Sequence, residues 1–94
     1  MNNRIILKFD KSLTNLAGYD YGLEIYNEQI KGKIDVEKEF LLEFPDQIRG
    51  VASSFVQGLF ANIVKQIGLL ATEERTQIIS KDPRLHNSIL NKLQ

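Results

Sequence analysis

The chain has 94 residues, and its 43% hydrophobic and 26% charged residues are the composition of a folded domain rather than of a disordered segment. Its 12 basic and 12 acidic residues cancel, so it lacks the positive excess on which nucleic-acid binders depend. The absence of cysteine excludes disulfides and thiolate metal sites. We therefore predict a single domain over residues 1–94 that binds no nucleic acid.

The same features predict a cytoplasmic location. The first ten residues lack the apolar core of a signal peptide. No stretch approaches the roughly 20 apolar residues that a membrane span needs, so no membrane association is expected. A secreted domain of this size would often need disulfides for its stability, which favours the same location.

The first predicted elements are a strand and a helix. Residues 4–9 are short, apolar and partly β-branched, which predicts a strand. One face of this strand carries Ile5, Leu7 and Phe9. A helix is expected over residues 17–30, ended by Gly32, although Gly18 and Gly22 weaken its first turns. Its apolar stripe comprises Tyr19, Leu23, Tyr26 and Ile30.

A connection and a central strand are predicted next. Residues 33–38 form a connection or, because Ile34 and Val36 alternate with charged residues, an exposed strand. Residues 39–44 are a short apolar run, which predicts a strand covered on both faces. Pro45 cannot donate a hydrogen bond to a ladder, so the strand is expected to end there.

The strongest helical pattern follows a short loop. Residues 46–50 form this loop, in which Gly50 permits a positive φ. Ser53 or Ser54 is the natural N-cap of the helix, and Gly68 ends it. Its apolar stripe comprises Phe55, Leu59, Ile63 and Ile67, with Phe60 and Val64 beside it.

The remaining residues predict a third strand and a last helix. Residues 69–75 form a connection with a helical turn capped by Thr72, and residues 76–80 form a short strand. Asp82 and Pro83 combine a cap with proline at the first helical position. The stripe of the last helix comprises Leu85, Ile89 and Leu93.

This alternation of strands and helices predicts an α/β fold. We expect a small layered domain with a short, mainly parallel sheet of about three to four strands and three helices. Open edges of such a sheet, together with the zero net charge, favour pairing with a partner or with a second copy of the chain.

Side chains for catalysis or for metal binding form no recognisable site. His86 is the one histidine, and we expect it on the surface of the last helix, so a histidine metal cluster is excluded. The acidic residues in 20–28 and 35–39 have the spacing of solvated faces. Glycine-rich phosphate loops are absent, and no base is placed near Ser53 for nucleophilic catalysis. We expect no metal, no cofactor and no enzymatic activity.

The serine pair at the start of the central helix is the candidate site. In the simpler interpretation, one serine caps the helix and contributes about 1 kcal/mol. In the functional interpretation, the free N–H groups and the positive end of the helix dipole favour a phosphate on a serine, and the added charge opens or closes a protein interface. The candidate residues are Arg49, Gly50, Ser53 and Ser54.

Residues 43–60 resemble the strand, loop and helix at the centre of STAS domains, the sulfate-transporter and anti-sigma-factor-antagonist domains. The Ser53-Ser54-Phe55 sequence after a short loop is closest to the STAS-like family of unknown function. In the antagonists a partner kinase phosphorylates the loop serine, and Ser53 takes that position here. Ala52 stands where the antagonists keep an acidic residue, and the bulky Phe55 is typical of the STAS-like group.

These observations predict a non-catalytic regulatory module that binds another protein, such as a kinase-like regulator, and is switched at Ser53 or Ser54. One alternative is a self-associating structural subunit, favoured by the neutral charge and the open strand edges. The other is a small inhibitor encoded by a mobile element, which the short length suggests.

Overall fold

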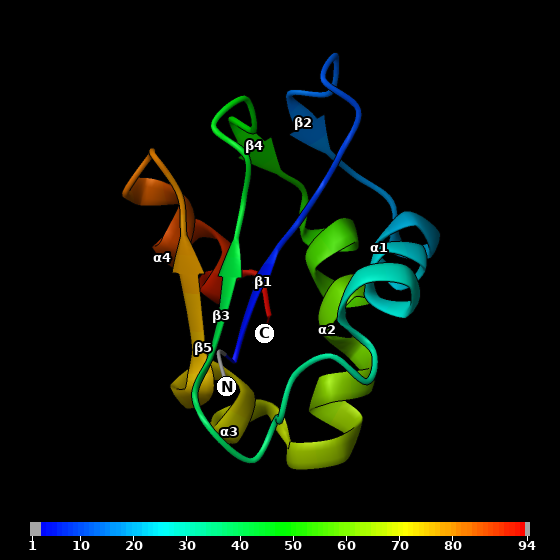
Figure 1. The fold of residues 1–94 in the computed structure, drawn as a ribbon, viewed down its shortest axis with the longest axis vertical. Coiled ribbons are helices and arrows are strands. Elements are labelled where there is room, and N and C mark those ends of the chain that lie inside the picture. Colours follow the sequence, from blue (N-terminus) through cyan, green and yellow to red (C-terminus); the bar gives the residue numbers. More distant parts are fainter. Residues whose placement is uncertain (1–2, 94) are drawn as a thin grey trace.

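Every strand pairing in the main sheet is parallel (Figure 1). In the computed structural model, which describes residues 3–93, this sheet contains β1 (Arg4–Ile6), β3 (Phe40–Glu43) and β5 (Thr76–Ile79) in the order β1-β3-β5. A second, shorter parallel pair joins β2 (Asn15–Leu16) to β4 (Gly50–Val51). The predicted α/β fold with a short parallel sheet is confirmed.

Four α-helices accompany the strands within the described residues. The helices are α1 (Tyr19–Ile25), α2 (Ser53–Ile67), α3 (Leu69–Arg75) and α4 (Arg84–Asn91), and a π-helical turn, η1 (Tyr26–Ile30), continues α1. The end of α2 agrees with the prediction, and Gly68 follows it with a φ of 86°. The segment before β5 is a complete helix, α3, rather than one capped turn. Its Thr72 is buried in mid-helix and donates its hydroxyl to the carbonyl of Gly68 at 2.7 Å.

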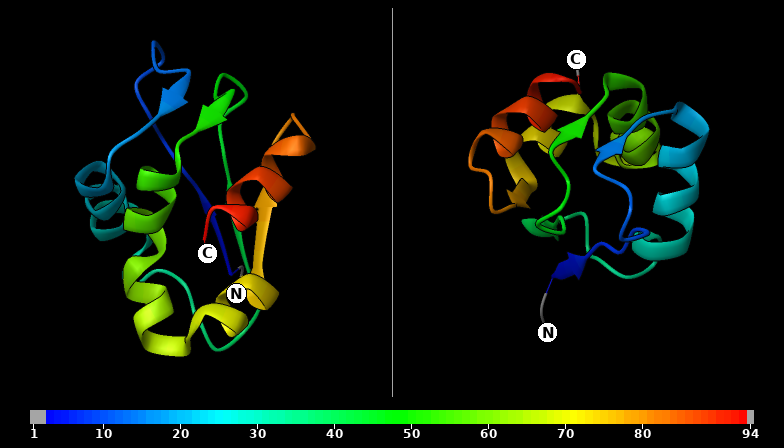
Figure 2. Two further views of the ribbon diagram at one scale, coloured as in Figure 1. Left: turned by 180° about the vertical axis from the view of Figure 1, so that it is seen from behind. Right: turned by 90° about the horizontal axis from the view of Figure 1, so that it is seen from above.

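The helices cover one face of the main sheet, as the front and rear views show (Figures 1 and 2). On this covered face the sheet buries Leu7 after β1, Phe40 and Leu42 of β3, and Ile78 of β5. On the other face Ile6 is 57% exposed, and Leu41 is only half-buried. The prediction that residues 39–44 are covered on both faces is therefore wrong, because within residues 3–93 no element packs over the second face.

Two glycines bring α1 and α2 into backbone contact. A Cβ on Gly22 would overlap the carbonyl oxygen of Phe55 and lie 2.6 Å from the amide nitrogen of Leu59. A Cβ on Gly58 would overlap the carbonyl oxygen of Tyr19. The two helices can approach this closely only because both positions lack a side chain.

This contact changes which face of α1 is buried. The buried residues are Gly22 and Ile25 of α1 with Tyr26 and Ile30 of η1, whereas Tyr19 is 46% exposed. The predicted stripe is therefore right at Tyr26 and Ile30 and wrong at Tyr19. The helix directs Gly22, rather than the side chain of Tyr19, toward α2. The wider π-helical turn η1 follows α1, and in it the Lys31 N–H donates to the carbonyl of Tyr26 at 2.8 Å.

The other predicted boundaries need small changes. Residues 33–38 are a connection, and the alternative of an exposed strand is wrong. The strands β1 and β5 end earlier than predicted, and Leu93 packs on the core from beyond the end of α4. The last helix begins at Arg84, so Pro83 rather than Asp82 is at its N-cap position and the predicted cap is wrong; Asp82 lies one residue earlier, where its Oδ1 accepts the backbone N–H of Arg84 at 3.0 Å.

No single helix in residues 3–93 has both the length and the apolar character to cross a membrane. The helices α2 and α3 meet these criteria only when taken together, and they are bent by 110° at the break between them.

Gly58→Ala tests the contact between α1 and α2. Helix propensity alone favours alanine over glycine by about 1 kcal/mol in a helix interior. Because the new Cβ would overlap the backbone of Tyr19, we expect the substitution instead to lower the free energy of unfolding by roughly 1–3 kcal/mol. Urea denaturation measures this change, with Gln57→Ala on the exposed side of α2 as the control. A stabilised Gly58→Ala protein would contradict the close contact.

Ile63→Ala tests the core face of α2. Ile63 is fully buried, so truncating its side chain leaves a cavity, and we expect a loss of roughly 2–5 kcal/mol in the free energy of unfolding. Denaturant unfolding of Lys65→Ala, on the exposed face of the same helix, provides the comparison. A loss below about 1 kcal/mol for Ile63→Ala would show that another face of α2 is buried.

Candidate functional site

The segment that leads into α2 is held on two sides. On one side, Arg49 N–H donates to the carbonyl of Thr14 at 2.7 Å, and Ala52 N–H donates to the carbonyl of Leu16 at 2.8 Å. On the other side, the Lys92 ammonium donates to the carbonyl of Val51 at 2.6 Å. The start of α2 is therefore fixed to β2 and to the C-terminal end of α4.

Gly50 provides space within this segment. A Cβ at Gly50 would lie 2.5 Å from Oδ1 of Asn15, its partner in the short β2–β4 pair. Gly50 does not use the positive φ that glycine permits, since the positive-φ residues within 3–93 are Gly18, Gly32 and Gly68. Gly50 therefore leaves room for the Asn15 side chain, which is exposed and would have to move aside for a larger residue.

The two serines have different surroundings. Gly18 N–H, at the start of α1, donates to Ser54 Oγ at 3.0 Å, so the Ser54 hydroxyl joins the beginnings of the two helices. Ser53 is exposed and is the first residue of α2. The residue at the N-cap position is Ala52, and no side chain caps the helix. The prediction that Ser53 or Ser54 is the N-cap is therefore wrong, and the first turn of α2 keeps its N–H groups available.

Arg49 lies toward α4. It lines two shallow hollows, of about 340 and 410 Å³, together with Asp82 and Arg84, and neither hollow includes Ser53 or Ser54 among its lining residues. Hydrogen bonds from the side chain and the backbone of Arg84 hold the pKa of Asp82 below its ordinary value. The four candidate residues therefore share one segment of the chain, but their side chains form no single cluster.

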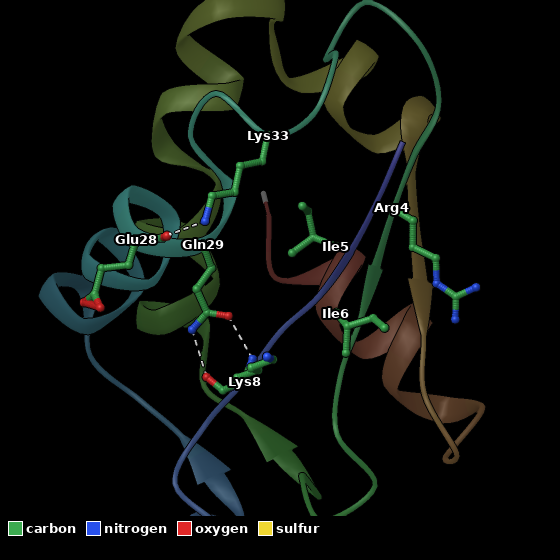
Figure 3. A pocket seen from close by; sticks show the side chains of 7 residues that line it. All are labelled: Arg4, Ile5, Ile6, Lys8, Glu28, Gln29 and Lys33. Atoms are coloured by element: carbon green, nitrogen blue, oxygen red, sulfur yellow. Dashed lines mark hydrogen bonds between the residues drawn. The ribbon is translucent and has the colours of Figure 1, made fainter. Parts of the chain in front are cut away.

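Two side chains outside the four candidate residues lie at the edges of the main sheet. Gln29 of η1 bonds twice to Lys8, because its Nε2 donates to the Lys8 carbonyl and its Oε1 accepts the Lys8 N–H, both at 2.8 Å (Figure 3). At the opposite edge, Nδ1 of His86 lies 3.3 Å from the amide nitrogen and 3.4 Å from the carbonyl oxygen of Ile78. His86 is half-buried against β5, not on the surface as predicted.

No group of three or more histidine and acidic side chains within residues 3–93 has the arrangement of a metal site. Glu28 is the one acidic side chain among the described residues that line the hollow beside β1. The described side chains therefore give no geometric basis for naming a metal ligand.

Comparison with known proteins identifies one family. Residues 21–92, most of the chain, match a family model described as a STAS-like domain of unknown function (DUF4325). No curated protein and no solved structure matches the chain. The predicted resemblance to this STAS-like group is confirmed, and the match includes Ser53 and Ser54.

Paired alanine substitutions distinguish the two serines. Ser54→Ala removes the acceptor of the Gly18 N–H and should lower the free energy of unfolding by about 1 kcal/mol. Ser53→Ala removes an exposed hydroxyl without a capping role and should change it by less than about 0.5 kcal/mol. Thermal or urea unfolding measures both changes. The reverse order of effects would show that Ser53, rather than Ser54, has the structural role.

Proposed function

Because the chain belongs to the STAS-like domain family of unknown function, we propose that it is a non-catalytic regulatory module that binds another protein and is switched by phosphorylation of Ser53. The observation that carries this proposal is the difference between the serines. Both serines are exposed, but the Ser54 hydroxyl accepts a hydrogen bond from Gly18, whereas the Ser53 hydroxyl, at the uncapped start of α2, makes no hydrogen bond within residues 3–93. Ser53 is therefore the serine that a kinase reaches without breaking a contact.

The start of α2 suits an added negative charge. The first turn of α2 contains no acidic residue, and no side chain bonds to its N–H groups. A helix N-terminus carries a partial positive charge, so a phosphate on Ser53 is stabilised there by the dipole and by the free N–H groups. Phosphorylation is thus compatible with the folded helix, and it changes the charge of the surface around Ser53.

The surroundings of Ser53 support a switch that acts by charge rather than by refolding. Hydrogen bonds to the carbonyls of Thr14 and Leu16 hold the segment before α2 on one side, and a hydrogen bond from Lys92 holds it on the other. A phosphate on this fixed segment adds negative charge to the interface with little movement of the backbone. The partner in this proposal is a cytoplasmic protein, and a kinase-like regulator is the first candidate.

Ser53→Asp tests the switch in a tagged pull-down from the native cell, read by mass spectrometry. We expect a partner that the wild type and Ser53→Ala both recover, and that Ser53→Asp loses or recovers at roughly a tenth of the wild-type amount, because the carboxylate supplies part of the charge of a phosphate. Equal recovery of the same partners by all three proteins would contradict the proposal.

The free energy of unfolding of each variant shows whether a loss of binding in the pull-down comes from unfolding. The aspartate should raise the free energy of unfolding by about 0.3–1 kcal/mol at low salt through its interaction with the helix dipole. Ser53→Asn, which is of equal size and uncharged, is the matched control. A loss of binding in a destabilised Ser53→Asp protein would reflect unfolding and would not support the switch.

A further inference from the structure

The strand β1 forms one edge of the main sheet, and its outer side has no neighbouring strand within residues 3–93. In the parallel ladder, Leu7 N–H donates to the carbonyl of Glu43 and Leu41 N–H donates to the carbonyl of Asn3, both at 2.9 Å. Successive residues of a strand direct their N–H and C=O groups to opposite sides, so Arg4 and Ile6 direct theirs away from β3. Within residues 3–93 no strand lies on that side.

Side chains occupy two other outward-facing positions at the edges of the sheet. At the far edge, the ring of His86 lies against the outward N–H and C=O of Ile78. After the end of β1, the Gln29 amide occupies both outward groups of Lys8, as a neighbouring strand would. Within residues 3–93 the open part of the β1 edge therefore consists of Arg4 and Ile6.

A hollow of about 630 Å³ lies beside this open edge. Figure 3 shows β1 on one side of it, and Glu28, Gln29 and Lys33 on the other. The Lys33 ammonium donates to the backbone carbonyl of Glu28 at 3.0 Å, which holds its charge at the hollow. A strand that pairs with β1 would lie about 5 Å away from it, on the side of this hollow.

We propose that the open edge of β1 binds an extended segment of a partner protein, with acidic side chains, as an added parallel or antiparallel strand. This surface is distinct from Ser53 and does not depend on the switch proposed there. The segment would receive backbone hydrogen bonds from Arg4 and Ile6, and Gln29 marks where the added strand ends. Edge addition of this kind takes its affinity from backbone bonds and its selectivity from flanking side chains.

The charges around the edge select an acidic segment. The basic side chains Arg4, Lys8 and Lys33 line the hollow with Glu28 as the single acidic one. Arg4 pairs with Glu43, whereas Lys8 and Lys33 form no ion pair within the described chain. Carboxylates on the added strand would therefore meet two uncompensated ammonium groups.

The same charges disfavour a second copy of the chain as the occupant. Two copies that paired antiparallel through the open positions would place Arg4 of each copy opposite Ile6 of the other, because Gln29 occupies the backbone of Lys8. Such a pair would bring no carboxylate of β1 to Lys8 or Lys33. An added strand with acidic side chains brings carboxylates to both ammonium groups.

The test uses the full chain and two soluble peptides of alternating residues, one of glutamate and valine and one of lysine and valine. Fluorescence anisotropy measures binding, and hydrogen exchange followed by NMR reports the amides of Arg4 and Ile6. We expect the glutamate peptide to bind at least about tenfold more tightly than the lysine peptide, and to slow exchange at those two amides. Equal affinity for the two peptides, or unchanged exchange at both amides, would overturn the proposal.

Two variants locate the binding site. Ile6→Pro removes an outward N–H but no hydrogen bond between β1 and β3, and such a position at a sheet edge tolerates proline. We expect this variant to lose binding of the glutamate peptide. Ile6→Thr keeps the N–H and should bind as the wild type does, within about twofold. If Ile6→Pro fails to fold, the double variant Lys8→Glu with Lys33→Glu provides the test, and it should reverse the preference between the peptides. Sedimentation of the free protein tests whether a second copy occupies this edge. The choice of partner would be overturned by a dimer that persists in Ile6→Thr and becomes tighter in the charge-reversed double variant.

Discussion

The contact between the backbones of α1 and α2 is the constraint on which the rest of the structure depends. Gly22 and Gly58 let the two helices touch, and each helix follows directly from one strand of the short β2–β4 pair. The distance between α1 and α2 therefore has to be compatible with the hydrogen-bonded distance between β2 and β4. The Gly18–Ser54 hydrogen bond is one result, because it joins the first turns of the two helices at the distance that the glycines allow. The position of Ser53 at the surface follows from the same geometry.

Elements determined by local periodicity were predictable from the sequence, and elements determined by distant contacts were not. The spacing of Phe55, Leu59 and Ile63 predicts α2, and residues 39–44 predict the central strand. Gly22 lowered the predicted helix propensity of α1, yet its importance lies in a contact with a segment more than thirty residues away in the sequence. The pattern of the central strand was compatible with two covered faces, but Leu41 and Glu43 lie on a face that no helix within residues 3–93 covers.

The candidate site shows the same division. The sequence indicates a serine pair at the start of a helix, because capping residues and the apolar stripe are local features. It does not indicate which serine is engaged, since Ser54 bonds to Gly18 across the α1–α2 contact. The positions of Gln29 and His86 at the two sheet edges depend on tertiary structure in the same way. One had no sequence signal of its own, and the other was a single histidine without a neighbouring ligand.

The strand order has a consequence for synthesis of the protein. The central strand, β3, is the second of the three to leave the ribosome, and β5 can join it only after α2 and α3 have also emerged. A nascent chain can pair β1 with β3 before that point, but Phe40 and Leu42 then border an incomplete layer. Pairings across long crossovers form slowly, and unpaired apolar strands are the segments from which aggregation begins. The apolar side chains of β3 are therefore most open to aggregation in the interval before β5 joins the sheet.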